Sequence, residues 1–238
     1  MLVAIHQPHY LPWLGYLHRM VQAELFIVLD HVQFERGNYQ NRTMVRVNGA
    51  PHWLTVPVAQ RSQKERIVDK AVDNSQEWAA SHYETLRRAY ASARYFGGYA
   101  DRLKSIYESP WERLVDLNDA LLELLRDAFA IRTPLVASSE LDVGGAKSEL
   151  VLNLCKAVGA HTLLVGLGGS RAYLDRAAFA EAGIALAFQE LNHPVYPQRG
   201  AAPFSPGLSA VDLLFNCGPD SRRVLLGQQN HRELSVAV

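Results

Sequence analysis

The sequence predicts an α/β fold in which a Rossmann-like, mostly parallel sheet carries helices on both faces and a helical insertion. Apolar runs rich in Val, Ile and Leu recur along the chain, and most of them lack the alternation of a half-exposed strand. Such runs are typical of strands that are buried on both faces of a sheet. Helical patterns separate several of the runs, which favours parallel winding. The runs lie at 2–5, 25–29, 53–58, 134–137, 162–167 and 183–188.

The alternation of helix and strand is clearest in the segment 147–188. Residues 147–158 carry an apolar stripe with helical spacing, and Gly159 follows at a position where helices commonly end. A second helix is predicted over 171–182, closed by Gly183 ahead of the next apolar run. The order helix, strand, helix, strand predicts a parallel α/β unit.

The middle of the chain shows helical spacing only. The apolar spacing is interrupted at 96–98 and at Ser109-Pro110, so more than one helix is expected there. After Pro219 the chain is polar with scattered apolar residues, which is compatible with partial disorder or with an arm swapped within a homodimer. The predicted division is an α/β core at 1–75 and 131–218, a helical insertion or cap at 76–130 and a tail at 219–238.

Composition narrows the classes of partner and site. The 24 basic and 24 acidic residues give zero formal net charge, so we expect no nucleic-acid partner, since such partners usually require a surplus of Lys and Arg on one face. No signal-peptide pattern and no apolar run of about 18 residues are found, so we expect a cytoplasmic protein without a membrane span. The two cysteines, Cys155 and Cys217, lie in helical patterns and indicate neither a disulfide framework nor a metal cluster.

The stretch HQPHYLPWLGY (6–16) follows the first apolar run and contains many hydrogen-bonding rings. Pro12 favours the first turn of a helix, so the stretch is predicted to be a strand-to-helix loop. Ligands of parallel sheets bind at the carboxyl ends of the strands, which puts this loop at the mouth of a site. The alternative is that the rings cap the core and that His6 is a satisfied buried histidine. The candidates are His6 and His9 for catalysis and Gln7 and Tyr10 for binding.

The second predicted strand leads polar residues to the same edge. Asp30 follows four apolar residues, where a carboxylate serves as base, metal ligand or hydroxyl acceptor, although it could also cap a turn. Gln33 comes shortly after it as a binding candidate. Farther along the loop, Asn41 and Arg42 could clamp a carboxylate or phosphate, with the arginine binding in a bidentate manner.

A third candidate segment is VGLGGSRAYLD (165–175), an apolar strand that runs into glycines and a helix start. Glycines allow a ligand to approach the backbone, and free N–H groups at a helix start attract anions. Gly169, Ser170 and Tyr173 are therefore predicted to bind substrate, with a structural N-cap as the alternative role of Ser170. Lys147 stands at another predicted helix start, but its spacing from the preceding glycines does not match the phosphate-loop pattern.

The last candidates lie in the loop LNHPVYPQ (191–198), whose proline punctuation is frequent in recognition loops. They are His193, Tyr196 and Gln198. HExxH, GxSxG and CxxC are absent from the sequence, and His6 with His9 has no third ligand at a recognisable spacing. No metal site is therefore predicted, although Asp30, His31 and His52 could approach one another in space.

Several motifs together resemble the WbqC-like protein family, over residues 3 to about 218. They are IHQPHYLPWLGYLHRM, LDHVQFERGNYQNR, WLTVPV, GGSRAYLD, HPVYPQ and LSAVDLLFNCG. The resemblance implies a bacterial enzyme of O-antigen, other surface-polysaccharide or secondary-metabolite biosynthesis that transfers a glycyl, other aminoacyl or acyl group. The chain departs from the family pattern at GLGGS, where a polar SG-type segment is expected. The matching positions include His6, Gln7, Tyr10, Asp30, Gln33, Asn41, Arg42, Tyr173, Asp175, His193, Tyr196, Gln198, Ser209, Asp212 and Asn216.

A looser similarity concerns the nucleotidylyltransferase superfamily, in which a histidine-bearing loop follows the first strand and a late serine at a helix start binds phosphate. The chain has these elements in that order but lacks a clean HxGH, so the similarity supports a fold more than an activity.

Three functions follow as hypotheses. The first is a transferase with a small-molecule donor and a sugar or nucleotide-sugar acceptor, with the donor phosphate near Ser170, Asp30 orienting His6 and Arg42 neutralising charge. The others are nucleotidylyl transfer with Mg²⁺ as cofactor and a non-catalytic ligand-binding accessory protein.

Overall fold

The computed structural model describes residues 1–59, 62, 64–166, 168, 170–200 and 202–227. Within them a five-stranded sheet has the order β5-β2-β1-β6-β7, and every neighbouring pair is parallel. The carboxyl ends of all its strands therefore lie at one edge. The winding changes direction between β1 and β6, which makes this position the topological switch point of the sheet. The strands are β1 (Leu2–His6), β2 (Leu25–Val28), β5 (Leu135–Ala137), β6 (Thr162–Val165) and β7 (Ala185–Phe188).

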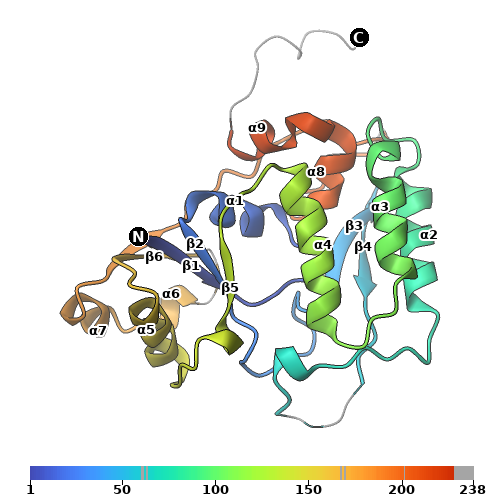
Figure 1. Ribbon diagram of the computed structural model, residues 1–238. Helices are drawn as coiled ribbons and strands as arrows, with labels where there is room; N and C mark the ends of the chain where they lie inside the picture. The colour runs from blue at the N-terminus through green and yellow to red at the C-terminus, as the bar shows by residue number, and fades with distance from the viewer. Residues whose placement is uncertain (60–61, 63, 167, 169, 201, 228–238) are drawn as a thin grey trace.

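Helices cover both faces of this sheet (Figure 1). Ala4, Phe26 and Leu164 join one core cluster with α1 (Leu14–Gln22) and α4 (Leu114–Ala128). Their chain neighbours Val3, Ile27 and Leu163 point to the other face and pack with α5 (Lys147–Ala157) and α7 (Arg176–Glu181). Alternate strand residues thus face two different cores, which explains the continuous apolar runs in the sequence. The predicted Rossmann-like sheet with helices on both faces is confirmed.

A separate antiparallel hairpin corrects one strand prediction. The apolar run 53–58 was expected to add a strand to the main sheet, but β4 (Ala50–Thr55) pairs with β3 (Arg42–Val47) outside it. Asn48 and Gly49, with φ values of 52° and 81°, form the turn between them. Two successive residues with positive φ are what a two-residue hairpin turn requires, and Asn-Gly supplies them at low cost.

The segment 76–130 consists mainly of helices, as predicted. The break at Ser109-Pro110 falls where the sequence indicated, but the first break lies at 91–96, and Gly97 and Gly98 already belong to the helix that follows it. The segment contains α2 (Trp78–Tyr90), α3 (Gly97–Glu108) and α4. These helices and the hairpin pack into the same core cluster as α1. Within the described residues, no helix is both long and apolar enough to cross a bilayer.

The single helix predicted at 171–182 is in fact two short helices, α6 (Ser170–Tyr173) and α7. Asp175 separates them because its side chain caps α7, accepting hydrogen bonds from Ala177 N at 3.1 Å and from Ala178 N at 3.2 Å. Aspartate is among the preferred N-cap residues because its carboxylate satisfies free N–H groups of the first turn.

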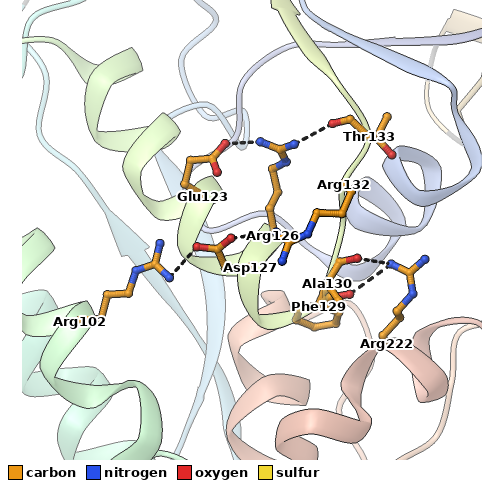
Figure 2. A network of polar contacts seen from close by, with 9 residues as sticks. All are labelled: Arg102, Glu123, Arg126, Asp127, Phe129, Ala130, Arg132, Thr133 and Arg222. Atoms are coloured by element: carbon orange, nitrogen blue, oxygen red, sulfur yellow. Dashed lines mark hydrogen bonds and ion pairs between the residues drawn. The ribbon is translucent and has the colours of Figure 1, made fainter.

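The start of the predicted tail is also helical. α8 (Ala210–Cys217) leads through a 3-10 turn (Gly218–Asp220) into α9 (Ser221–Leu225), while residues 228–238 lie outside the described chain. Figure 2 shows how α9 is fastened to the end of α4: Arg222 donates to the carbonyl oxygens of Phe129, at 3.3 Å, and Ala130, at 2.9 Å. Nearby, Asp127 is paired with Arg102 of α3 and with Arg132. Three helices are thereby joined at one point.

Candidate functional site

The switch point between β1 and β6 brings several sequence-predicted segments to one edge of the sheet. His6 is the last residue of β1, Asp30 follows β2, and Gly166 follows β6 directly. Because β2, β1 and β6 are adjacent and parallel, the loops after them are neighbours. Ser170 begins α6 shortly after β6, and Gly169 lies outside the described residues. The common edge on which the predicted site depends is therefore present in the fold.

Four aromatic rings gather where β1 ends, and we refer to them as the histidine cluster: His6, His9, Tyr16 and Tyr39. The rings of His6 and His9 meet edge to face with centroids 4.4 Å apart. Tyr16 lies 4.8 Å from His6 and 5.1 Å from His9, and Tyr39 stacks on His9 at 5.4 Å. His6 remains half-buried, and its Nδ1 lies 3.0 Å from the carbonyl oxygen of Gln7. The cluster combines an accessible imidazole with a buried one.

Two buried polar atoms of this cluster have no hydrogen-bond partner among the described residues, namely His9 Nδ1 and the Tyr16 hydroxyl. The His9 side chain is 5% exposed, and this burial lowers its pKa to about 3, so the ring is neutral at physiological pH. Burial also raises the pKa of Tyr16, and the carboxylate of Asp119 adds to that rise. Buried polar groups without partners are uncommon in proteins and mark places where a ligand or water is expected.

Asp119 is a member of this region that the sequence did not reveal. It belongs to α4, its side chain is exposed, and desolvation by the surrounding protein raises its pKa to about 7, with Asp116 and Asp30 adding to the rise. The residue as a whole is exposed, while neighbouring protein desolvates its carboxyl group. A carboxyl group that titrates near neutral pH is a candidate acid or base.

A chain of hydrogen bonds attaches this part of α4 to the loop after β1. Asn118 Nδ2 donates to the carbonyl oxygen of Gln40 at 2.9 Å, and Gln40 Nε2 donates to Gln7 Oε1 at 2.8 Å. Gln7, which was predicted to bind substrate, therefore has a protein partner on one side. Its amide links the loop to α4 and so holds the histidine cluster and Asp119 in a fixed relation.

Asp30 has a structural role in the fold. The side chain is 2% exposed; Oδ1 accepts from Ser138 Oγ and Ser139 N, both at 2.9 Å, and Oδ2 accepts from Ser139 Oγ at 2.6 Å. It thus caps the 3-10 turn Ser138–Glu140 that follows β5. The expected orienting contact between Asp30 and His6 is absent among the described residues, because His6 Nδ1 lies against Gln7 instead.

Three other predicted binding residues fasten the segments around the cluster. Tyr10 is fully buried and turns into the helical region, where its hydroxyl contacts His82 Nδ1 at 2.9 Å and the Tyr107 hydroxyl. Asn41 Nδ2 donates to the carbonyl oxygen of Val56 at 2.8 Å. The Arg42 guanidinium lies over the Trp53 ring at 4.3 Å and donates to the carbonyl oxygen of Gly37. These contacts hold the loop and the hairpin, so the predicted anion clamp at Arg42 has no support in the geometry.

The late candidates belong to a second network, centred on the fully buried carboxylate of Asp212. Asp212 accepts hydrogen bonds from the hydroxyls of Tyr90 and Tyr196 and from Gln198 Nε2, each at 2.8 Å. Arg46 donates to Gln198 Oε1 at 2.5 Å. His193 Nε2 accepts from Gly207 N at 3.1 Å. No hydrogen bond or ring contact between described residues joins this network to His6 or His9, so His193, Tyr196 and Gln198 belong to a contact network separate from the histidine cluster.

The remaining predicted residues, Gln33, Lys147 and Tyr173, are exposed. Lys147 is exposed at the start of α5, and Tyr173 at the end of α6 is 46% exposed. Gln33 lines a cavity of about 470 Å³ with Phe34, Glu35, Arg36, Ser62, Glu65 and Lys70. A cavity of about 620 Å³ lies elsewhere, between the start of α2 and the end of α3, and includes Trp78 and Tyr83. Because none of its lining residues comes from a strand end, we do not assign the chemistry to it.

Arg19 was also missed by the sequence analysis. It lies on α1 with 5% of its surface exposed, and its Nη1 occupies the space that a Cβ atom on Gly166 would need. Nothing in the local pattern of α1 distinguishes this arginine from a surface residue.

In the described part of the chain, no group of three or more His, Cys, Asp or Glu side chains could hold a metal ion.

Comparison with known proteins agrees with the motifs. The model of the WbqC-like protein family matches residues 7–224. The chain is 30% identical over 221 residues to "Uncharacterized protein Rv1507c" of Mycobacterium tuberculosis (strain ATCC 25618 / H37Rv), which covers 92% of this chain and 95% of that relative. No solved structure gives a significant match. The family match covers most of the chain, and this chain therefore belongs to the WbqC-like protein family.

Proposed function

We propose that the protein is a transferase of surface-polysaccharide or secondary-metabolite biosynthesis that moves an acyl or aminoacyl group, such as glycyl, onto a sugar or nucleotide-sugar. Membership of the WbqC-like family supports the pathway. The observation that carries the proposal is the pair of imidazoles at the switch point, where half-buried His6 contacts buried, neutral His9. Switch points of parallel sheets are the usual ligand sites of such folds.

The two histidines have different roles in this proposal. Histidine has an ordinary pKa of about 6.5, so the accessible ring of His6 can accept a proton from the acceptor hydroxyl or amine as that group attacks the acyl carbonyl, and can return it to the leaving group. His9 stays neutral, so its unpartnered Nδ1 can hydrogen-bond to the substrate without adding charge. Asp119 is a second group able to exchange a proton near neutral pH.

A transfer assay with a His6 variant tests the proposal. The protein is incubated with aminoacyl and acyl donors and with nucleotide-sugars, and mass spectrometry follows the added acyl mass. We expect His6→Gln to lower the rate about 100-fold or more, the usual effect of removing a general acid–base group, with little change in melting temperature. The matched control is His161→Gln, because His161 is exposed just before β6, at the opposite edge of the sheet, and contacts the N-terminal amine. Equal rates in both variants would contradict the role of His6.

A second candidate is nucleotidylyl transfer, which is favoured by the strand order together with the histidine loop after β1 and the helix start after β6. This reaction needs Mg²⁺ bridging the phosphates of a nucleoside triphosphate, and such an ion is usually held by the phosphates and one or two carboxylates. Asp119 is the exposed carboxylate near the site that could contribute. Stabilisation by a triphosphate only in the presence of Mg²⁺ would favour this candidate. Ligand binding without any turnover would favour a non-catalytic accessory protein.

A further inference from the structure

The guanidinium of Arg19 is a buried cation that has no anionic partner among the described residues. No carboxylate of the described residues lies within ion-pairing distance of it, and its Nε has no hydrogen-bond partner there. Burial lowers its pKa to about 10, which still leaves it charged at neutral pH. A buried charge without a partner is strongly unfavourable, so a fold that keeps one is expected to gain something else from it.

The other buried cations of the described chain are compensated. Lys70 pairs with Glu65 at 2.8 Å and lies over the ring of Phe34. Arg46 is as deeply buried as Arg19 and its Nε is also unpartnered among the described residues, but its two terminal nitrogens donate to Gln198 Oε1 and, at 2.8 Å, to the carbonyl oxygen of Ala202, and its charge acts on the carboxylate of Asp212. Arg19 is therefore the exception, and packing alone does not account for it.

The position of Arg19 points to a ligand at the switch point. Gly166 is the first residue after β6, and a side chain there would overlap the guanidinium, so glycine is what allows α1 to bring its arginine to the end of this strand. Tyr173 is near enough for the Arg19 charge to oppose the rise that burial causes in the Tyr173 pKa. Since Tyr173 is 46% exposed, it marks the side from which solvent reaches this region.

We infer that Arg19, set against Gly166, binds the phosphate oxyanions of a nucleotide-bearing substrate. A guanidinium matches phosphate with parallel hydrogen bonds and is the usual residue for partly buried phosphate contacts. A ligand anion would supply the missing counter-charge, and the Tyr173 hydroxyl could add a donor. This assignment rests on the proposed function, because it names the part of the nucleotide-sugar that the site holds beside the histidine cluster.

The inference is tested by unfolding experiments that need no turnover. The wild-type protein, Arg19→Met and Arg46→Met are melted with and without inorganic pyrophosphate, and with a nucleoside diphosphate as a second probe. Pyrophosphate should raise the melting temperature of the wild type and of Arg46→Met, but not that of Arg19→Met. Without ligand, Arg19→Met should melt at the wild-type temperature or a few degrees higher, because an uncompensated charge is removed, whereas Arg46→Met should melt lower.

A second variant distinguishes loss of the anion site from poor folding of Arg19→Met. Gly166→Ala keeps the arginine but places a methyl group where its Nη1 lies, so it should weaken pyrophosphate binding at least tenfold by calorimetry. The inference is overturned if pyrophosphate does not stabilise the wild type, if Arg19→Met retains the full shift, or if Arg19→Met is destabilised as much as Arg46→Met. The wild type is also melted with acetate as a carboxylate control. Stabilisation by acetate but not by pyrophosphate would overturn the assignment to phosphate.

The outcome separates this inference from the proposed transferase. Pyrophosphate carries neither an acyl group nor a sugar, so an Arg19-dependent shift together with failed transfer would refute the transferase and leave the anion site standing. Successful transfer together with an Arg19→Met variant of unchanged activity and unchanged pyrophosphate shift would refute the anion site alone.

Discussion

Asp119 gives the molecule a titrating group near neutral pH, and the sign of its effect on stability follows from its surroundings. Its pKa of about 7 in the folded protein lies above the ordinary value of about 3.9 for aspartate. Between these two pH values the folded state holds a proton that the unfolded state has released, so its contribution to stability falls as pH rises from about 4 to about 7.

We expect Asp119→Asn to match the wild type at pH 4 and to melt roughly 2–4 °C higher at pH 8, an increment of about 1 kcal/mol that allows for solvent screening of the exposed carboxylate. Thermal unfolding at the two pH values measures this difference. Asp101→Asn on α3 is the control, because Asp101 is an exposed aspartate outside the set of charged groups that act on Asp119, and it should show no gain at high pH. A gain for Asp119→Asn that is the same at both pH values would contradict the raised pKa.

At the level of single residues, the sequence identified the groups whose position follows from a strand end. His6, Gln7 and His9 were proposed because they follow an apolar run, and the rings of His6 and His9 meet at the end of β1. The capping role of Asp30 was left as an alternative, since its serine partners lie more than 100 residues away in the chain. Arg19 and Asp119 were missed because their burial and charged neighbours come from tertiary packing, which no local pattern encodes.

At the level of elements, the attachment of α9 to α4 gives a measurable prediction. Arg222 satisfies the carbonyl oxygens of Phe129 and Ala130 just beyond the end of α4 (Figure 2). Arg222→Ala should lower stability by about 1 kcal/mol, because carbonyls at a helix end lose a charged donor, and the melting temperature should fall by roughly 2–4 °C. Differential scanning calorimetry measures the change.

The neighbouring arginine is the matched control for that experiment. Arg223 pairs with Asp220 at 2.9 Å, three residues away at the surface, and such pairs contribute little to stability. Arg223→Ala should therefore leave the melting temperature nearly unchanged. If the two variants are equally stable, the contacts of Arg222 do not anchor α9.

Helix ends could be predicted from the sequence where a proline stops the helix. Ser109-Pro110 correctly marked the end of α3, whereas the break expected at FGG lies a few residues earlier, at 91–96. Asn48-Gly49 also carried a hairpin signal, yet the apolar run at 53–58 was assigned to the main sheet, because apolar content alone does not tell which sheet a strand joins. The helix predicted at 171–182 was wrong for a similar reason: apolar spacing continues across Asp175, whose capping bonds end one helix and begin another.

At the level of the whole molecule, the order of the strands creates the site. Parallel winding could be predicted from alternating helices and strands, but the neighbours of β1 could not, since β2 and β6 lie about 20 and about 160 residues from it. This order places the loop after β1, which carries the histidine cluster, beside the end of β6. There the Arg19 guanidinium packs against Gly166. In the proposed site the histidine cluster transfers protons. Arg19 supplies a positive charge that no carboxylate of the described residues neutralises.

The central claim is that both halves serve one ligand, and a crystal structure of the protein with a bound nucleotide-sugar tests it most directly. We expect the diphosphate oxygens within hydrogen-bonding distance of the Arg19 guanidinium and the sugar within reach of the His6 ring. A ligand seated instead in the cavity lined by Trp78 and Tyr83, with the histidine cluster and Arg19 untouched, would contradict the account.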